Sequence, residues 1–380
     1  VAPGAAGDIA FLKDRGGAEN AQVHVYRAAE RSVLRLTDGK ALHGGLAWSP
    51  DGRRLAFHGN GRNGVDYDVY VAELAGAVAV PAAAAPAAGG AVDGVPVIAV
   101  APRLAIAAQS RQLRPVEWSP DGSRLLLRHD QSINESYLYV ADPTAGTLTQ
   151  LPTGTGPDGK PSAETVAIGA AHFSADGAGV WFVSDIGSEF ARILYLDLAS
   201  GASREPFAGP AQWDVEDLEV SADGRWLAWV TNVDGLSRLS LYDLGARREL
   251  RPTGLPPGEI GGLRFDRASR RLGLTLDGPQ APRDALVYEI ERDALVRWTR
   301  SETGPVDPAR FVPAELVRYP TWDRSGGQPR QVPAWVWKPR GPGPHPVLVD
   351  IHGGPESQAR PNFSAFTQFL VNALGYAVLQ

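Results

Sequence analysis

The sequence predicts an all-β propeller of about six visible blades, followed by the truncated beginning of an α/β domain. The propeller is expected at residues 1–305 and the incomplete second domain at 306–380. Three observations predict this fold class. A short turn motif recurs between residues 48 and 269, and each copy is followed by apolar segments. Glycine and proline, with 43 and 31 of 380 residues, are over-represented, which favours many turns. After residue 306 the repeat stops and a different pattern begins.

The repeated motif is an aromatic or apolar residue followed by Ser, Pro or Ala, Asp and Gly. An adjacent Asp and Gly suit a tight turn between two strands, because Gly adopts the positive φ that such a turn requires. The full copies occupy residues 48–52, 118–122, 173–177 and 220–224, and a degenerate fifth copy occupies 265–269. By itself the motif predicts a turn and no chemistry.

A third strand is predicted after each copy of the motif, and a short fourth strand after that. Four short antiparallel strands per repeat are typical of a propeller blade. The third strands are expected at 68–71, 136–140, 193–196, 239–242 and 285–288. Residues 9–12 and 23–26 read as strands of a further blade, and a seventh blade would be completed upstream. The insertion at 75–108 is either a solvated loop with a strand at 95–100, or an arm that reaches a neighbouring subunit or guards an opening.

The last seventy residues predict the opening of a βαβ unit. Residues 315–319 and 332–337 read as paired strands, and 346–351 is an apolar run of the kind found in buried parallel strands. A helix is expected to be capped by Asn362 and to stop at Gly375, because apolar residues between them recur at helical spacing. A further strand begins after that glycine.

Composition excludes several classes of function. The chain has no cysteine, so it can form no disulfide, thiolate nucleophile or zinc ribbon. Its formal charge of −6 argues against nucleic acid or an anionic membrane as partner. The sequence shows no metal-ligand spacing, phosphate loop or dinucleotide fingerprint, so no cofactor is expected. The compartment stays open between cytoplasmic and periplasmic or secreted, in a bacterium with GC-rich coding.

The apolar run at 346–351 leads directly into His352, Gly353 and Gly354. Glycines let a backbone approach a substrate closely, and a free N–H there can donate to the negative oxygen of a tetrahedral intermediate. In α/β-hydrolases one of the two oxyanion donors comes from a loop of this kind. Together with the propeller repeat, the motif resembles the prolyl oligopeptidase family of serine peptidases, in its acylaminoacyl-peptidase-like branch. The resemblance covers essentially the whole chain.

This resemblance implies that the second domain is the start of an α/β-hydrolase catalytic domain. It implies that oligopeptides pass the propeller and are hydrolysed through a Ser-Asp-His triad. It also implies that Gly354 supplies a backbone oxyanion donor and that Gly353 belongs to the same oxyanion loop. No Gly-x-Ser-x-Gly occurs in the 380 residues, so the triad is expected beyond Gln380 and the chain alone is expected to be inactive.

Two further groups are candidates for substrate binding. Arg360 follows the glycine loop closely and could contact a substrate carbonyl or carboxylate, and the alternative is a structural arginine. Glu216 and Asp217, with Glu219 beside them, could attract the amino terminus of a peptide, as acidic pairs do in related dipeptidyl peptidases. The alternative for this acidic group is a solvated blade edge.

The sequence thus predicts a serine-type peptidase that hydrolyses short peptides, with the propeller gating access. Two alternatives remain: a non-catalytic TolB-like propeller that binds protein partners, and an esterase on the same hydrolase fold. The bond cleaved (after proline, acyl-aminoacyl or dipeptidyl) and the oligomeric state stay open. Trp48 and Trp118 are expected to be largely buried at equivalent places in their blades.

Overall fold

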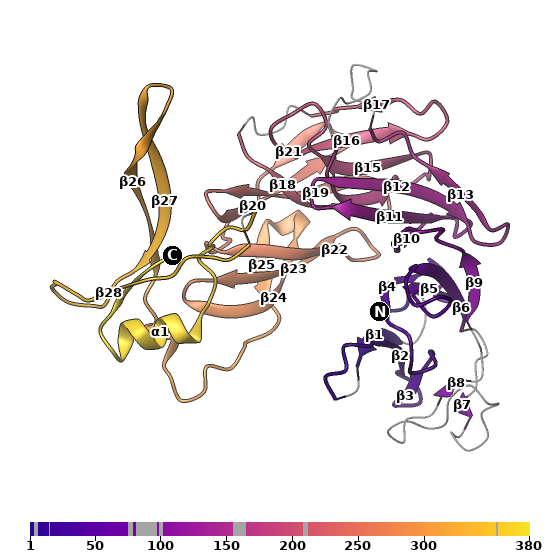
Figure 1. The fold of residues 1–380 in the computed structure, drawn as a ribbon, viewed down its shortest axis with the longest axis horizontal. Helices are drawn as coiled ribbons and strands as arrows, with labels where there is room; N and C mark the ends of the chain where they lie inside the picture. The colour runs from indigo at the N-terminus through magenta and orange to yellow at the C-terminus, as the bar shows by residue number, and fades with distance from the viewer. Residues whose placement is uncertain are drawn as a thin grey trace. The chain divides into compact units, whose positions relative to one another are not determined.

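The structure of the protein is a computed structural model that describes residues 1–3, 7–14, 16–74, 79–80, 97–98, 102–154, 165–207, 212–354 and 356–380. These residues form β-sheets joined by turns, with one eight-residue α-helix among them (Figure 1). The chain divides into two compact units, Val1–Ala208 and Gly209–Gln380. Within the described ranges, no helix combines the length and the apolar character that a membrane span requires.

The first unit contains four sheets. Three are four-stranded and antiparallel, with orders β4-β5-β6-β9, β10-β11-β12-β13 and β14-β15-β16-β17, and the N-terminal one has the order β1-β2-β3-β8-β7. The strands are β1 (Ile9–Lys13), β2 (Gln22–Arg27), β3 (Ser32–Arg35), β4 (His43–Trp48), β5 (Arg54–Gly59), β6 (Asp68–Glu73), β7 (Ala79–Val80), β8 (Val97–Ile98), β9 (Arg103–Ile106), β10 (Leu113–Trp118), β11 (Leu125–Ser132), β12 (Glu135–Asp142), β13 (Thr147–Gln150), β14 (Ile168–Phe173), β15 (Gly179–Ser184), β16 (Arg192–Asp197) and β17 (Ser203–Arg204).

The second unit contains two more antiparallel sheets, β18-β19-β20-β21 and β22-β23-β24-β25, and a last sheet of order β26-β27-β29-β28. Its elements are β18 (Val215–Val220), β19 (Trp226–Val233), β20 (Leu236–Asp243), β21 (Arg248–Leu250), β22 (Glu259–Phe265), β23 (Arg271–Gly278), β24 (Ala281–Glu289), β25 (Ala294–Arg297), β26 (Ala314–Ser325), β27 (Gln328–Trp337), β28 (Val347–Val349), α1 (Ala365–Asn372) and β29 (Ala377–Leu379). One 3-10 turn, Ile290–Arg292, lies between β24 and β25, and a second, Pro308–Arg310, lies between β25 and β26.

The sheets confirm the repeat that the sequence predicts. Each copy of the motif lies between the first and second strand of a four-stranded antiparallel sheet, and the third strands fall at β6, β12, β16, β20 and β24. With the N-terminal sheet this makes six sheets before the last one, which is consistent with a propeller. The seventh blade upstream and the domain boundary near residue 305 stay predictions.

Most of the insertion at 75–108 lies outside the described residues. Two described pieces of it, β7 and β8, pair with each other, and β8 also pairs with β3. The strand expected at 95–100 is therefore confirmed at Val97–Ile98. A further strand, β9, pairs with β6 and is the short fourth strand that the repeat predicts for the sheet of β4, β5 and β6.

Neighbouring sheets within each unit pack through apolar side chains. In the first unit, Ala56 of β5 and Leu125 of β11 lie fully buried in one core cluster. In the second unit, Leu241 of β20 and Leu272 of β23 share another cluster, again fully buried. Each such sheet therefore covers the inner face of the next, as stacked sheets do.

The repeated motif forms the tight turn that its sequence predicts. In the second copy, the Ser119 hydroxyl donates to the Asp121 carboxylate (2.6 Å) and accepts the backbone N–H of Arg124 (2.9 Å), while Gly122 has a φ of +69°. The other full copies repeat both serine hydrogen bonds. In the fifth copy Ser269 replaces the glycine and still adopts a φ of +55°. The motif is a structural turn.

These hydrogen bonds predict that the first unit loses stability in acid. The Ser119 hydroxyl, followed by the groups of Ser123, lowers the pKa of Asp121 to about 2. Because this folded-state pKa lies below the ordinary value of about 3.9, the stabilisation is complete above about pH 4 and is lost as the pH falls through the folded-state value. We expect the free energy of unfolding, measured by urea denaturation, to fall over that range, and to fall less in Ser119→Ala. An equal fall in both proteins would contradict this explanation.

An arginine after the first turn connects one sheet to the next. The Nη2 of Arg54 donates to the carbonyl of Gly122 (2.7 Å), and its guanidinium lies 4.3 Å from the centroid of the Trp118 ring. Trp118 donates from Nε1 to the Ala47 carbonyl (3.0 Å) and is 4% exposed, which confirms its predicted burial. Trp48 is half-buried against the adjoining core cluster, so the prediction for this residue is met only in part.

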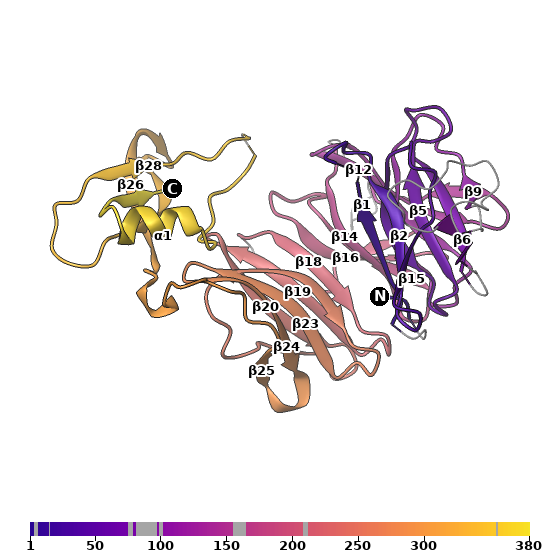
Figure 2. The same ribbon diagram turned by 90° about the horizontal axis from the view of Figure 1, so that it is seen from below.

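The last sheet departs from the antiparallel repeat. β26 and β27 form a long hairpin, β27 pairs antiparallel with β29, and β28 runs parallel to β29. α1 connects β28 to β29 and lies beside this sheet (Figure 2). Its Leu370 and Val371 pack against the sheet in one core cluster. The segment is a βαβ unit, as predicted, but no α/β-hydrolase domain is seen in the part of the chain that the structure describes.

The helix begins two residues later than the sequence suggests. Its N-cap is Ser364, whose hydroxyl accepts an N–H of the first turn (3.1 Å). The side-chain amide of Asn362 instead donates to Glu259, so it does not cap the helix. Phe363 lies before the helix and packs against Phe311, with ring centroids 5.0 Å apart.

Candidate active site

The glycine loop follows β28, where the carboxyl ends of two parallel strands meet. Ligands of α/β sheets bind preferentially at this edge. The Gln380 side chain, just past β29, donates to the carboxylate of Asp350, just past β28 (2.8 Å). A cavity of about 370 Å³ lies here and is lined by both residues together with Tyr319, Trp335 and His352.

Gly354 has the conformation and the exposure that a backbone donor in this loop needs. Its φ is +71°, which glycine adopts readily, and apart from its chain neighbours no described residue has an atom within 4 Å of the place where a Cβ would stand. Its carbonyl accepts the N–H of Ser357 (2.9 Å), whereas its own N–H has no hydrogen-bond partner among the described residues. Gly353 is equally open, and the Nδ1 of His352 lies 3.4 Å from its carbonyl oxygen. The roles of both glycines in an oxyanion loop stay predictions.

Arg360 and Glu216, which the sequence put forward as separate candidates, lie together. The Nη2 of Arg360 is 2.9 Å from Glu216 of β18, and its Nη1 is 3.6 Å from Glu259 of β22. Its Nε donates to the carbonyl of Gly235 (3.2 Å), in the turn between β19 and β20. The Arg360 side chain is 14% exposed, so its charge is surrounded by protein groups. Sequence reasoning missed Glu259, because no local pattern connects it to a residue 101 positions later.

The other two acidic residues of the group point to different partners. Asp217 accepts the N–H of Leu263 through Oδ2 (3.4 Å) and the N–H of Leu218 through Oδ1 (2.9 Å). Glu219 is 5% exposed and is paired with Arg264 (3.2 Å). Both carboxylates therefore bind groups of β18 or β22, whereas Glu216 faces Arg360. A role of Glu216 or Asp217 in binding a peptide amino terminus stays a prediction.

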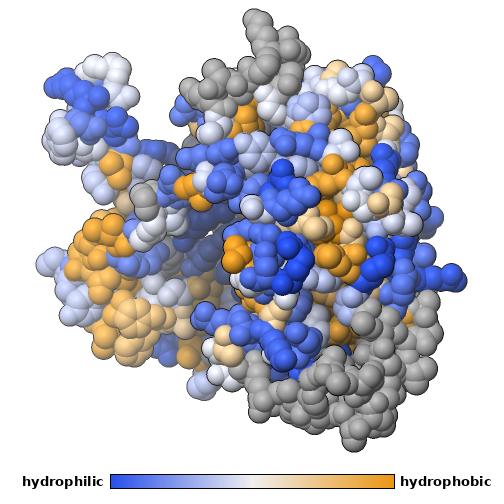
Figure 3. All heavy atoms as spheres, turned by 45° about the vertical axis from the view of Figure 1, so that its right-hand side comes forward, coloured by the Kyte–Doolittle hydropathy of each residue, from blue (hydrophilic) through white to orange (hydrophobic). Residues whose placement is uncertain are grey.

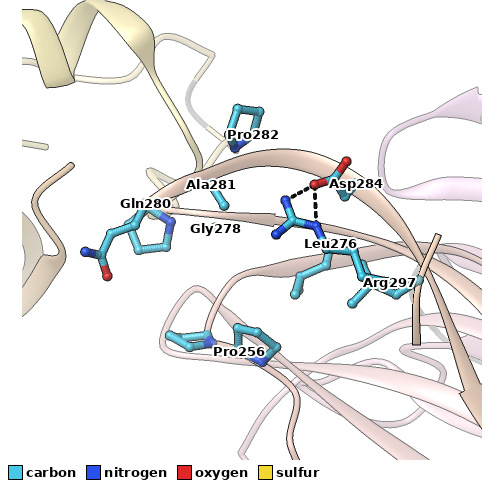
Figure 4. A pocket seen from close by; sticks show the side chains of 11 residues that line it. Pro256, Leu276, Gly278, Gln280, Ala281, Pro282, Asp284 and Arg297 are labelled. Atoms are coloured by element: carbon cyan, nitrogen blue, oxygen red, sulfur yellow. Dashed lines mark hydrogen bonds and ion pairs between the residues drawn. The ribbon is translucent and has the colours of Figure 1, made fainter. Parts of the chain in front are cut away.

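A second cavity, of about 150 Å³, lies between the turn before β22 and the hairpin of β23 and β24 (Figure 4). It is mostly apolar, with prolines such as Pro256 and Pro282 and the side chain of Leu276 in its wall. Its charged groups, Arg297 and Asp284, are paired with each other. Asp284 is 4% exposed and accepts three further hydrogen bonds from Thr299 and Ser301, so the cavity offers no free nucleophile or base.

Among the described residues, no group of three or more His, Cys, Asp or Glu side chains could hold a metal ion. The region does present an open glycine loop and the ion pairs around Arg360.

No family model matches the sequence, and no curated protein sequence matches it. Solved structures do match. One, from a study of two prolyl endopeptidases, has a TM-score of 0.69 and 16% identity and covers 98% of this chain and 52% of its own. A puromycin-hydrolyzing peptidase from Mycobacterium tuberculosis has a TM-score of 0.70 and 15% identity and covers 98% and 56%. Dipeptidyl peptidase 4 from Porphyromonas gingivalis has a TM-score of 0.57 and 16% identity and covers 97% and 56%.

At these identities the likeness is one of fold. The chain spans about half the length of the structures that it matches. Its fold is similar to that of the β-propeller domain of prolyl oligopeptidase-family peptidases.

Proposed function

We propose that the chain is the propeller and the leading part of the catalytic domain of a serine peptidase of the prolyl oligopeptidase family. The observation that carries this proposal is the open Gly353-Gly354 loop at the carboxyl end of a parallel strand, in the sheet that follows the repeated antiparallel sheets. Short peptides would be the substrates, the propeller would gate their access, and no cofactor, nucleic acid or membrane would take part. We propose the acylaminoacyl-peptidase-like branch of this family, as the sequence resemblance implies.

In this proposal the chain contributes one part of the catalytic machinery. The N–H of Gly354 would donate to the oxygen that becomes negative when a nucleophile attacks the scissile carbonyl. The nucleophilic serine, its histidine base and the aspartate that orients the base would lie beyond Gln380, since that order is usual in α/β-hydrolases.

Uncovered apolar side chains around the last sheet support a catalytic domain that continues. Val347 and Val349 of β28 are 60% and 59% exposed, and Phe366 and Phe369 of α1 are 65% and 53% exposed. Figure 3 shows hydrophobic surface over this part of the chain. Because a parallel strand is normally buried on both faces, further strands and helices of a hydrolase domain would cover these residues.

A serine-directed fluorophosphonate probe tests the proposal. The 380-residue chain is expected to stay unlabelled, because an oxyanion donor without nucleophile and base retains little of the covalent mechanism. A longer protein that continues beyond Gln380 is expected to be labelled at one serine, and heat denaturation should abolish the labelling. Specific labelling of the 380-residue chain would contradict this placement of the triad.

A longer protein that takes up no label would favour a non-catalytic, TolB-like binding role instead. Comparing amide with ester substrates then separates a peptidase from an esterase.

A further inference from the structure

The residues that follow the glycine loop are held firmly on the sheets of the second unit. We call residues 357–363 the anchor segment. Its side chains and backbone reach four elements of the two antiparallel sheets. The contacts are Asn232 to Gln358 Oε1 (2.7 Å), Arg360 to Glu216 and Glu259, Asn362 to Glu259, and the Phe363 N–H to Asp277 (3.0 Å).

Arg360 stands at the centre of these contacts. Its guanidinium is the group that neutralises Glu216 and Glu259, which are 31% and 29% exposed and belong to different strands. A guanidinium is a planar fork, so contacts in three directions fix its position as well as its charge. Without it, the two carboxylates would repel each other and would lose the interaction that draws them to the anchor segment.

The anchor segment in turn holds Gly354. The N–H of Ser357, its first residue, donates to the Gly354 carbonyl. On the other side of the loop, the backbone is next held at Asp350, whose N–H donates to the carbonyl of Leu379. Since both glycines are open to solvent and have no Cβ to pack, the orientation of Gly354 depends on these two attachments.

We propose that Arg360 is a positioning residue that keeps the Gly354 N–H in one orientation by clamping the anchor segment between Glu216 and Glu259. The clamp itself follows from the contacts of this chain, and only its use in catalysis rests on the proposed function. In this role the guanidinium acts through the protein backbone and has no need to touch the substrate.

Hydrogen exchange tests the clamp in the 380-residue chain. In Arg360→Gln, the amide protons of Ser357, Asn362 and Phe363 are expected to exchange at least about tenfold faster. These three residues belong to the anchor segment, and their hydrogen bonds open more often when the clamp no longer holds that segment. The matched control is Arg264→Gln, which removes another arginine–glutamate pair between β18 and β22 without touching the anchor segment. Its exchange at the three amides should stay as in the unaltered chain.

If Arg360→Gln fails to fold, the pair Glu216→Gln and Glu259→Gln removes the same ion pairs with the arginine kept, and should accelerate the same amides. Unchanged exchange in a folded variant of either kind would overturn the clamp.

Turnover in the longer protein tests the positioning role. A small misplacement of a catalytic group can cost up to about 10²-fold in rate, so Arg360→Gln should lower kcat by about tenfold or more while KM changes little. Arg360→Lys, which restores the charge without the fork, should recover part of the loss. Faster exchange with unchanged kcat would overturn the positioning role. If the longer protein shows no serine hydrolase activity at all, the proposed function fails, while the exchange measurement still decides on the clamp.

Discussion

Replacing Trp118 with alanine is expected to lower the free energy of unfolding of the first unit by about 3–5 kcal/mol, the cost of removing a large aromatic side chain from a packed core. The indole is 4% exposed and lies in the core cluster shared by two neighbouring sheets. The substitution would also remove the hydrogen bond to Ala47 and the ring beneath Arg54. Urea denaturation followed by circular dichroism measures the loss.

The comparison truncation is Trp322→Ala, in the second unit, whose own free energy of unfolding is measured. Its indole lies on the β26–β27 hairpin and is 95% exposed, so the same truncation removes almost no buried area. Surface substitutions of this kind usually change stability by no more than about 0.5 kcal/mol. A loss below about 1 kcal/mol for Trp118→Ala would mean that the indole is outside a packed core, and it would contradict the packing of the two sheets.

Gly354→Pro is expected to lower turnover of the longer protein by about 10²–10³, the loss seen when one oxyanion donor is removed. Proline has no N–H, and its ring fixes φ at about −65°, whereas Gly354 has a φ of +71°. The substitution therefore removes the donor and also changes the backbone. Turnover under saturating peptide, measured after circular dichroism has shown native folding, reports the effect.

Gly354→Ala separates the loss of the N–H donor from the change in the backbone. Alanine keeps the N–H, its Cβ would enter open space, and the positive φ costs only about 1–2 kcal/mol. We expect this variant to keep most of the turnover that Gly354→Pro loses. Normal turnover in a folded Gly354→Pro protein would remove Gly354 from the catalytic machinery.

The repeat could be predicted because each of its turns is specified locally. The serine, aspartate and glycine of the motif form their hydrogen bonds within six residues, as Ser119, Asp121 and Arg124 show. The start of α1 was predicted two residues early for the opposite reason. Asn362 has the side chain of an N-cap, but Glu259, a residue 103 positions earlier, takes its amide, and Ser364 caps the helix instead.

The candidate site also has one part that the sequence predicts locally and one part that depends on long-range contacts. The glycine loop is a local pattern after an apolar run, so its place at the end of β28 followed from the sequence. The joining of Arg360 with Glu216 and Glu259 depends on tertiary contacts between residues that are more than 100 positions apart. Their charges made Arg360 and Glu216 separate candidates for substrate binding. Only the fold shows that the two side chains neutralise each other.

A crystal structure of the longer protein with a covalently bound serine-directed phosphonate would test the central claim most directly. The phosphonate oxygen stands in for the oxyanion of the tetrahedral intermediate. We predict that this oxygen lies about 2.7–3.1 Å from the Gly354 nitrogen, the distance expected of an oxyanion donor. An adduct whose oxygen is held by other groups, with the Gly354 N–H turned away from it, would contradict the account.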